Sequence, residues 1–232
     1  DCDLQFMDAK SKDGHSVLLH STAHLMAQAV KRLYPKTKVT IGPYLENRFY
    51  YDFDVETPFS EEDLSKIEKE MVKISEENLM ITHEIKSRKD ALSYFDKIKE
   101  NYKVEIINDL DKDETLKMYS QGEFTDLCRG PHIPSTGLIK HFKILSSSAA
   151  YWRGDEKNQT LQRLYGTSFQ NSKDLKKYLL MLEEQKKRDH RKIGKELDLF
   201  FFDDEVGPGL PLWTPSGTVL IDELEALAKE KE

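Results

Sequence analysis

Two pairs of residues with chemically active side chains stand out in this sequence, His20 and His24 in HSTAH and Cys128 and His132 in CRGPH. Imidazole and thiol groups bind metal ions or move protons near neutral pH, so these residues predict a hydrolytic or metal-binding site. The members of each pair are four residues apart. On an α-helix such residues lie on the same face, so a helical HSTAH would direct both imidazoles to one point.

Two kinds of chemistry fit these four residues. Together they could supply two or more nitrogens and one thiolate to a tetrahedral Zn²⁺ ion. The same set could act without a metal, with a neutral imidazole taking a proton from water and a cationic group stabilising the charge that develops on an attacked carbonyl. Either pair alone is a weak signal, and residue types and spacing leave both alternatives open.

The segment TLKMYSQGEFTDLC predicts a β-hairpin with QG at the turn, which would deliver Asp126 and Cys128 at the end of a strand. Loops that follow strands are common places for chemistry. Lys103 precedes VEIIN, which predicts a strand, and a lysine there is expected to face solvent. The remaining histidines examined, His15, His83, His141 and His190, are interpreted as surface residues.

The elements that must position these residues can be predicted from capping and periodicity. A helix is expected from Ser16, as N-cap, to about Tyr34, because Pro35 ends it. A second helix is expected from Ser60 to Asn78, with Asp63 completing a capping box. Strands are predicted for KVTIGP, NRFYYDFDV, ITHEIKS, KVEIIN, FKILSSSAAYWRG and LQRLYGTSF, and a short helix for KDALSYFDKIKEN. The absence of a regular βαβ repeat indicates an α+β fold.

Composition limits the class of protein. The chain has 232 residues, of which 38% are hydrophobic and 33% charged, as in soluble globular proteins. No apolar run approaches the roughly 18 residues of a membrane-spanning helix, and two cysteines cannot build a disulfide framework, so a reducing, cytoplasmic location is expected. A net charge of −7 argues against general nucleic-acid binding but permits local basic tracts such as KKRDHRKIGK at 186–195.

The order of the motifs HSTAH, IGPYLENRFYYDFD, YKVEI, DLCRGPH, AYWRGD, LQRLYGTSF and RDHRKIGKELDLF closely resembles class II threonyl-tRNA synthetases of bacterial type. The resemblance runs through most of the chain in one order. It assigns residues 1–8 to a remnant of an upstream domain or linker and residues 9–172 to an editing domain. Residues 173–195 would form a linker helix, and residues 196–232 the truncated start of the aminoacylation domain.

The resemblance implies a two-layer α+β domain of mixed or antiparallel strands that hydrolyses serine wrongly esterified to threonine tRNA. Serine differs from threonine by the absence of one methyl group, and the contacts of one methyl group contribute only about 1–3 kcal/mol to discrimination in a binding pocket. A second site must therefore remove serine that the synthetic site attaches to the tRNA by mistake. Matched by position, the family's catalytic residues are His20, Lys103, His132 and Cys128. Asp126, Tyr51 and His24 match its substrate-binding residues, with Asp126 expected to hold the seryl ammonium.

The same resemblance gives expectations for cofactors and partners. Editing should need no metal, although His20, His24, Cys128 and His132 are the candidate ligands if zinc is bound. ATP, Mg²⁺ and the zinc of synthesis would belong to the absent catalytic domain. The partner would be the acceptor end of tRNA(Thr) carrying serine, with no membrane involved, and the full-length enzyme would be a homodimer although the fragment could be a monomer.

Two alternatives and one departure accompany this interpretation. The domain could be a zinc-stabilised structural unit. It could also be a tRNA-binding module without hydrolytic activity, an alternative suggested by the basic tract at 186–195. The departure is Arg48, which stands where many family members have glycine in the ENGFYYD segment. The turn before Tyr51 could therefore differ, or a cation could be offered to the end of the tRNA.

Overall fold

The structure is a computed structural model that describes residue 8 and residues 11–232. The segment 1–8, assigned above to a remnant of an upstream domain or linker, therefore lies outside the described residues, apart from Asp8. The chain divides into two compact units, one ending at Leu175 and the other comprising Lys176–Glu232. All the residues singled out as candidate site residues belong to the first unit.

The main sheet of the first unit has the strand order β1 (Lys38–Val39), β3 (Arg48–Asp54), β8 (Thr160–Phe169) and β7 (His141–Tyr151), and β2 (Tyr44–Leu45) also pairs with β3. Every pairing is antiparallel. The strand predicted for NRFYYDFDV is confirmed as β3, and its alternate residues Phe49, Tyr51 and Phe53 are buried on one face.

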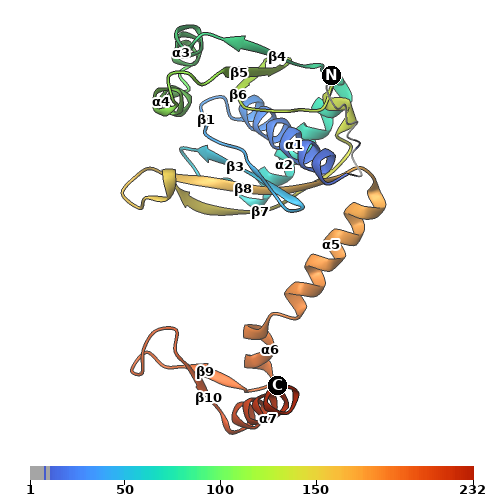
Figure 1. The fold of residues 1–232 in the computed structure, drawn as a ribbon, viewed down its shortest axis with the longest axis vertical. Coiled ribbons are helices and arrows are strands. Elements are labelled where there is room, and N and C mark those ends of the chain that lie inside the picture. The colour runs from blue at the N-terminus through green and yellow to red at the C-terminus, as the bar shows by residue number, and fades with distance from the viewer. Residues whose placement is uncertain (1–7, 9–10) are drawn as a thin grey trace. The chain divides into compact units, whose positions relative to one another are not determined.

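Two helices, α1 (Lys12–Leu33) and α2 (Glu61–Glu77), lie against this sheet (Figure 1). The capping box of α2 is confirmed, because Ser60 and Asp63 bond each other's backbone amides. The predicted N-cap of α1 at Ser16 is wrong. Ser11 caps the helix instead, accepting a hydrogen bond from the Gly14 amide, so α1 begins five residues earlier than expected.

A smaller sheet in the same unit consists of β4 (Ile81–Lys86), β5 (Leu116–Gln121) and β6 (Phe124–Leu127). Its β5–β6 hairpin turns at Gly122, which has a φ of 57°, as the QG signal predicts. The helices α3 (Arg88–Lys97) and α4 (Asn101–Asp109) pack beside it around a second, smaller hydrophobic core. The helix predicted for KDALSYFDKIKEN corresponds to α3.

The strand predicted for KVEIIN is wrong, because these residues form α4. The β-branched composition favours a strand locally, but Lys103 and Ile107, four residues apart, are both buried on one helical face. The start of α4 is held by Glu100, whose carboxylate accepts hydrogen bonds from the Lys31 ammonium at 2.6 Å and the Val39 amide at 3.0 Å. Tertiary packing therefore overrides local propensity here.

The second unit contains most of α5 (Ser172–Lys187), followed by α6 (His190–Glu196), β9 (Phe200–Phe202), β10 (Pro211–Trp213) and α7 (Pro215–Lys231). The single linker helix predicted for 173–195 is therefore split into two. Asp189 is extended, and its side chain caps α6 by accepting from the Arg191 amide.

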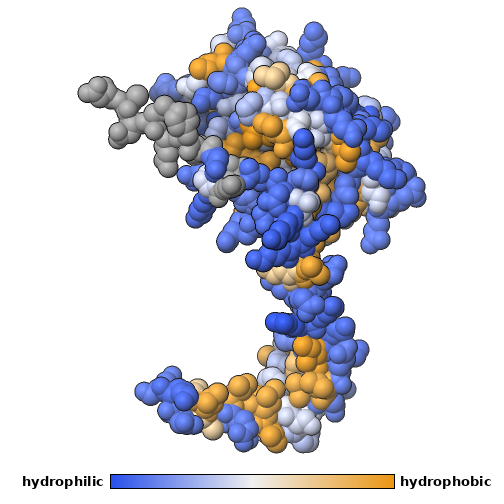
Figure 2. Space-filling model, turned by 90° about the vertical axis from the view of Figure 1, so that its right-hand side faces the viewer, coloured by the Kyte–Doolittle hydropathy of each residue, from blue (hydrophilic) through white to orange (hydrophobic). Residues whose placement is uncertain are grey.

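Exposed hydrophobic side chains occur on the second unit, including Phe201, Phe202, Trp213 and Leu224 (Figure 2). Short 3₁₀ helices at Thr136–Leu138 and Trp152–Gly154 complete the structure of the first unit. Within the described part of the chain, no helix combines the length and the apolar character needed to cross a membrane.

Candidate functional site

The HSTAH segment lies in the middle of α1, which confirms the prediction that its two histidines share a helical face. The ring centroids of His20 and His24 are 5.1 Å apart. His20 is half-buried, whereas His24 is only 4% exposed. The helix therefore presents one imidazole toward the surface and one toward the interior.

Cys128 follows β6 directly, at the predicted transition from strand to loop. Its Sγ atom lies 2.9 Å from His20 Nε2 and 3.3 Å from His132 Nε2, and it accepts a hydrogen bond from the Gly130 amide at 3.1 Å. The two distant pairs therefore meet. We call the three half-buried residues His20, Cys128 and His132 the outer group.

A second set of polar side chains lies deeper. The Tyr51 hydroxyl donates to Asp126 Oδ2 at 2.6 Å, and Lys103 forms an ion pair with Asp126 Oδ1 and donates to the Tyr51 hydroxyl oxygen at 3.2 Å. His24 Nε2 lies 3.6 Å from Asp126 Oδ2. We call Tyr51, Lys103, Asp126 and His24 the inner group; β3, α4, β6 and α1 contribute one residue each.

Burial separates the inner group from the outer group. Tyr51, Lys103 and Asp126 are 0%, 2% and 1% exposed. Lysine and aspartate are almost never this buried unless they are paired, since an isolated charge in the interior is costly. The expectation from the local pattern that Lys103 faces solvent is therefore wrong, because its ammonium is buried against Asp126 and Tyr51.

The protonation equilibria of the site follow from this burial. Burial lowers the pKa of His20, and it lowers that of His24 and His132 further with the help of neighbouring imidazoles. Burial also raises the pKa of the Cys128 thiol to about 11. At neutral pH the three imidazoles are therefore neutral and the sulfur is a thiol.

The remaining histidines lie outside both groups. His15 was expected to lie before the helix and on the surface, but it belongs to the first turns of α1 and is half-buried. Its ring contacts the Phe169 ring in a tilted arrangement with a centroid distance of 5.1 Å. His83 and His190 are exposed, as predicted, and His141 is partly exposed. Arg48 begins β3 after a turn in which Asn47 has a φ of 57°.

Two residues that contact the site were not singled out from the sequence. Ser21 Oγ lies 3.0 Å from His132 Nδ1, and the Tyr119 ring packs on the His132 ring with a centroid distance of 4.5 Å. Ser21 could have been found, because it is three residues before His24 and so close to the same helical face. Tyr119 carries no such signal, since its position depends on how the β5–β6 hairpin packs against α1.

The four residues His20, His24, Cys128 and His132 could hold a metal ion. Each offers one ligand atom, and these atoms lie within 4.8 Å of one another. Two or three imidazoles with one thiolate are ligands that Zn²⁺ accepts. Deprotonation of Cys128, whose pKa is raised in this structure, would have to accompany such binding.

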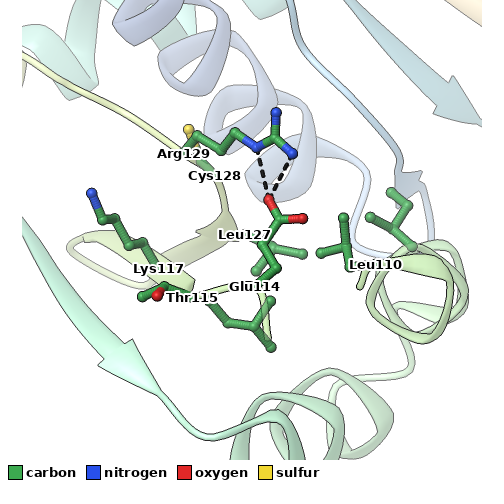
Figure 3. A pocket seen from close by; sticks show the side chains of 9 residues that line it. Leu110, Glu114, Thr115, Lys117, Leu127, Cys128 and Arg129 are labelled. Atoms are coloured by element: carbon green, nitrogen blue, oxygen red, sulfur yellow. Dashed lines mark hydrogen bonds and ion pairs between the residues drawn. The ribbon is translucent and has the colours of Figure 1, made fainter. Parts of the chain in front are cut away.

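A pocket of about 170 Å³ opens beside Cys128, between α4 and the β5–β6 hairpin. Leu110, Leu116 and Leu127 give it an apolar floor. Figure 3 shows Arg129 and Glu114 joined across one side, where Arg129 Nη2 donates to Glu114 Oε1 at 2.6 Å. Cys128 is the member of the outer group that lines this cavity, which has an apolar interior and a charged edge.

Comparison with known proteins agrees with this geometry. Residues 116–165, which include Asp126, Cys128 and His132, match the family model described as the threonyl and alanyl tRNA synthetase second additional domain. The fold and the site thus define a domain of the kind found in aminoacyl-tRNA synthetases, built as the expected α+β structure.

Curated relatives identify the particular family. The chain is 55% identical over 225 residues to a threonine–tRNA ligase of Pelobacter propionicus, covering 97% of the chain and 35% of the relative. It is 55% identical over 216 residues to that of Anoxybacillus flavithermus (93% and 34%) and 53% identical over 232 residues to that of Maridesulfovibrio salexigens (100% and 36%). The chain belongs to the threonine–tRNA ligase family and spans about a third of the length of these relatives, which confirms the resemblance drawn from its motifs.

Proposed function

We propose that this chain is the editing part of a threonine–tRNA ligase and hydrolyses the ester between serine and tRNA(Thr). One observation carries the proposal: a half-buried cluster of neutral imidazoles and a thiol lies directly against a buried carboxylate and ammonium. Such a site offers a proton acceptor, a cation and a recognition group for a small polar acyl group. Hydrolysis of an ester needs these components.

In the proposed reaction, His20 accepts a proton from water as the water oxygen bonds to the ester carbonyl carbon. His20 suits this role because it is the half-exposed imidazole of α1 and its lowered pKa keeps it neutral at pH 7. The bond from carbon to the ribose oxygen then breaks, and that oxygen takes the proton back from His20. His20 Nε2 contacts Cys128 Sγ in the structure, so the water would compete with the thiol for this nitrogen.

Lys103 and Asp126 are proposed to set the charge of the pocket. The Lys103 ammonium would help to position the water and offset negative charge on the attacked carbonyl oxygen. Asp126 would hold the seryl ammonium. Its oxygens already bind Lys103, the Leu127 amide, Tyr51 and, most loosely, His24 at 3.6 Å. We therefore expect the substrate ammonium to displace the neutral His24 from Asp126 Oδ2.

The remaining residues are proposed to shape the pocket. Tyr51 holds the carboxylate of Asp126 in place, and the His132 and Cys128 side chains form a wall beside His20. A pocket of this kind removes serine and spares threonine if it lacks room for one more methyl group. That selection complements a synthetic site that cannot exclude the smaller amino acid.

The experiment is hydrolysis of seryl-tRNA(Thr) and threonyl-tRNA(Thr) by the purified chain. His20→Ala should slow serine release by about 10²–10⁴-fold, the range that a positioned general base contributes. His141→Ala, which removes a partly exposed histidine of β7, is the matched control and should behave as the unaltered chain. Equal serine release by the unaltered chain and by His20→Ala would contradict the proposal.

For the full-length protein we propose ligation of threonine to tRNA(Thr) with ATP, in a cytoplasmic homodimer. The ligation is supported by the similar proteins of Pelobacter propionicus and Anoxybacillus flavithermus, which are threonine–tRNA ligases. The chain on its own is expected to lack ligase activity. Residues 9–172 are proposed as the editing domain, 173–195 as the linker and 196–232 as the start of the synthetic domain.

A second candidate function is a structural metal site, which the mutual distances of His20, His24, Cys128 and His132 favour. Zinc would then add to stability, because ligands that come together only in the folded chain couple binding to folding. Stoichiometric zinc that survives dialysis and a fall in thermal stability after chelation would support this function. A metal-free chain with an intact fold and full deacylase activity would refute it.

A further inference from the structure

Ser21 joins α1 to the loop that carries His132. It is completely buried, and its Oγ atom lies 3.0 Å from His132 Nδ1. The amide of Ile133 donates to the same oxygen at 3.1 Å. One hydroxyl therefore contacts two consecutive residues of the loop after Cys128.

The direction of these hydrogen bonds follows from what each group can do. The Ile133 amide can only donate, so Ser21 Oγ accepts from it. The hydroxyl hydrogen of Ser21 still needs an acceptor. Among the described residues, His132 Nδ1 is the one further polar atom bonded to Ser21 Oγ. The neighbouring Thr22 instead donates to the backbone oxygen of Leu18 at 2.7 Å, a bond that Ser21 does not make within the described structure.

A buried hydroxyl hydrogen without an acceptor is unfavourable, so Ser21 donates to His132 Nδ1. A neutral imidazole has one donor and one acceptor nitrogen, so a His132 ring that accepts the Ser21 hydrogen at Nδ1 carries its own proton on Nε2. We propose that Ser21 is a positioning residue that fixes His132 in the tautomer with its proton on Nε2, directed at Cys128 Sγ. Nε2 lies 3.3 Å from that sulfur.

This arrangement orders the outer group. Cys128 Sγ receives hydrogen bonds from the Gly130 amide and from His132 Nε2, which leaves its own hydrogen directed toward His20 Nε2 at 2.9 Å. Ser21 thus controls, through His132, how the thiol is held beside the proposed base. The functional part of this inference rests on the proposed deacylase activity, whereas the tautomer is independent of it.

The same tautomer disagrees with a four-ligand metal site. With its proton on Nε2, His132 has no lone pair at the atom that faces Cys128, and a metal-bound nitrogen must supply one. A metal bound to His132 Nε2 would leave the ring proton on Nδ1, so the Ser21 hydroxyl could no longer donate to Nδ1. Its hydrogen would then have no acceptor among the described residues. The residue types fit zinc, but the hydrogen bonding of Ser21 does not.

The test is ¹⁵N nuclear magnetic resonance of the histidine-labelled chain without added metal, in which the two nitrogen shifts of each ring report its tautomer. Comparison with His132→Gln identifies the His132 signals. We expect the Nε2–H form in the unaltered chain, in Ser21→Thr and in the control Ser16→Ala, an exposed-side serine of α1 that bonds the Lys12 oxygen. Ser21→Ala should give a mixture of tautomers. An Nδ1–H form in the unaltered chain, or an unchanged form in Ser21→Ala, would overturn the proposal.

Deacylation kinetics supply the second measurement. Ser21→Ala should lower kcat for seryl-tRNA by about 10-fold or more, as loss of a group that orients an active-site histidine does. KM should stay nearly constant, and Ser21→Thr should restore kcat. If the unaltered chain carries the expected tautomer but releases no serine, the proposed function fails and the tautomer stands. If Ser21→Ala changes the tautomer but not kcat, the positioning role is refuted.

Discussion

The inner and outer groups differ in charge and in burial although they share a boundary at His24 and His132, whose rings lie 4.3 Å apart. The inner group contains a carboxylate and an ammonium that are almost completely buried. The outer group is neutral at pH 7 and half-buried. The inner group should therefore contribute mainly to the stability and charge of the pocket, and the outer group mainly to reactions with molecules that enter from solvent.

Breaking the inner ion pair should have the largest effect on stability. Lys103→Met leaves the carboxylate of Asp126 buried without its cation, and loss of one partner of a buried pair costs about 3–5 kcal/mol. The measurement is urea unfolding followed by the fluorescence of Trp152, in a Trp213→Phe background so that only the first unit is observed.

Two controls make this measurement specific. Lys143→Met removes a half-exposed lysine that pairs with Glu68 at 2.7 Å, and it should cost less than about 1 kcal/mol. Adding Asp126→Leu to Lys103→Met should recover part of the loss, since no unpaired charge remains. Additive losses in the double variant would show that the two side chains do not stabilise each other, and the description of the inner group would be wrong.

A smaller effect is expected at Tyr51. Tyr51→Phe keeps the ring that packs in the core and removes only the hydroxyl that donates to Asp126 Oδ2 at 2.6 Å. A hydrogen bond to a charged group contributes about 1.5–3 kcal/mol, so unfolding measured as above should shift by that amount. Tyr50→Phe on the opposite face of β3 is the matched control. Equal shifts for both tyrosines would contradict a special role for the Tyr51 hydroxyl.

The inner group also marks the limit of prediction from the sequence. The His20–His24 face, the β5–β6 hairpin and the position of Cys128 were predicted correctly because they depend on residues near one another in sequence. Lys103 was placed on a strand facing solvent because its β-branched neighbours favour a strand locally. Its burial depends on Asp126 and on Glu100 at the start of α4, contacts between distant segments that periodicity does not contain. The family resemblance groups Lys103 with the other candidate residues, and its catalytic role stays a prediction.

A different limit applies to the four candidate metal ligands, which are the outer group together with His24 of the inner group. The residue types at 20, 24, 128 and 132 fit both a metal site and a metal-free site, and spacing cannot decide between them. The structure adds a hydrogen bond between His132 Nδ1 and Ser21, a residue within the same HSTAH motif, which bears on the tautomer of His132. Ligand types can thus be read from a sequence, whereas the direction of their hydrogen bonds depends on the folded neighbours.

The smallest effect on stability is expected at Cys128. Cys128→Ala removes a half-buried thiol from the edge of the site without leaving a charge unpaired, so unfolding of the first unit should shift by less than about 1 kcal/mol. Deacylation is the more sensitive measurement, because the substitution frees His20 Nε2 from the thiol and removes the sulfur that contacts both His20 and His132. We expect the ratio of serine to threonine release to change more than stability does. A loss of stability as large as that of Lys103→Met would show that the outer group is structural, and it would remove the distinction between the two halves of the site.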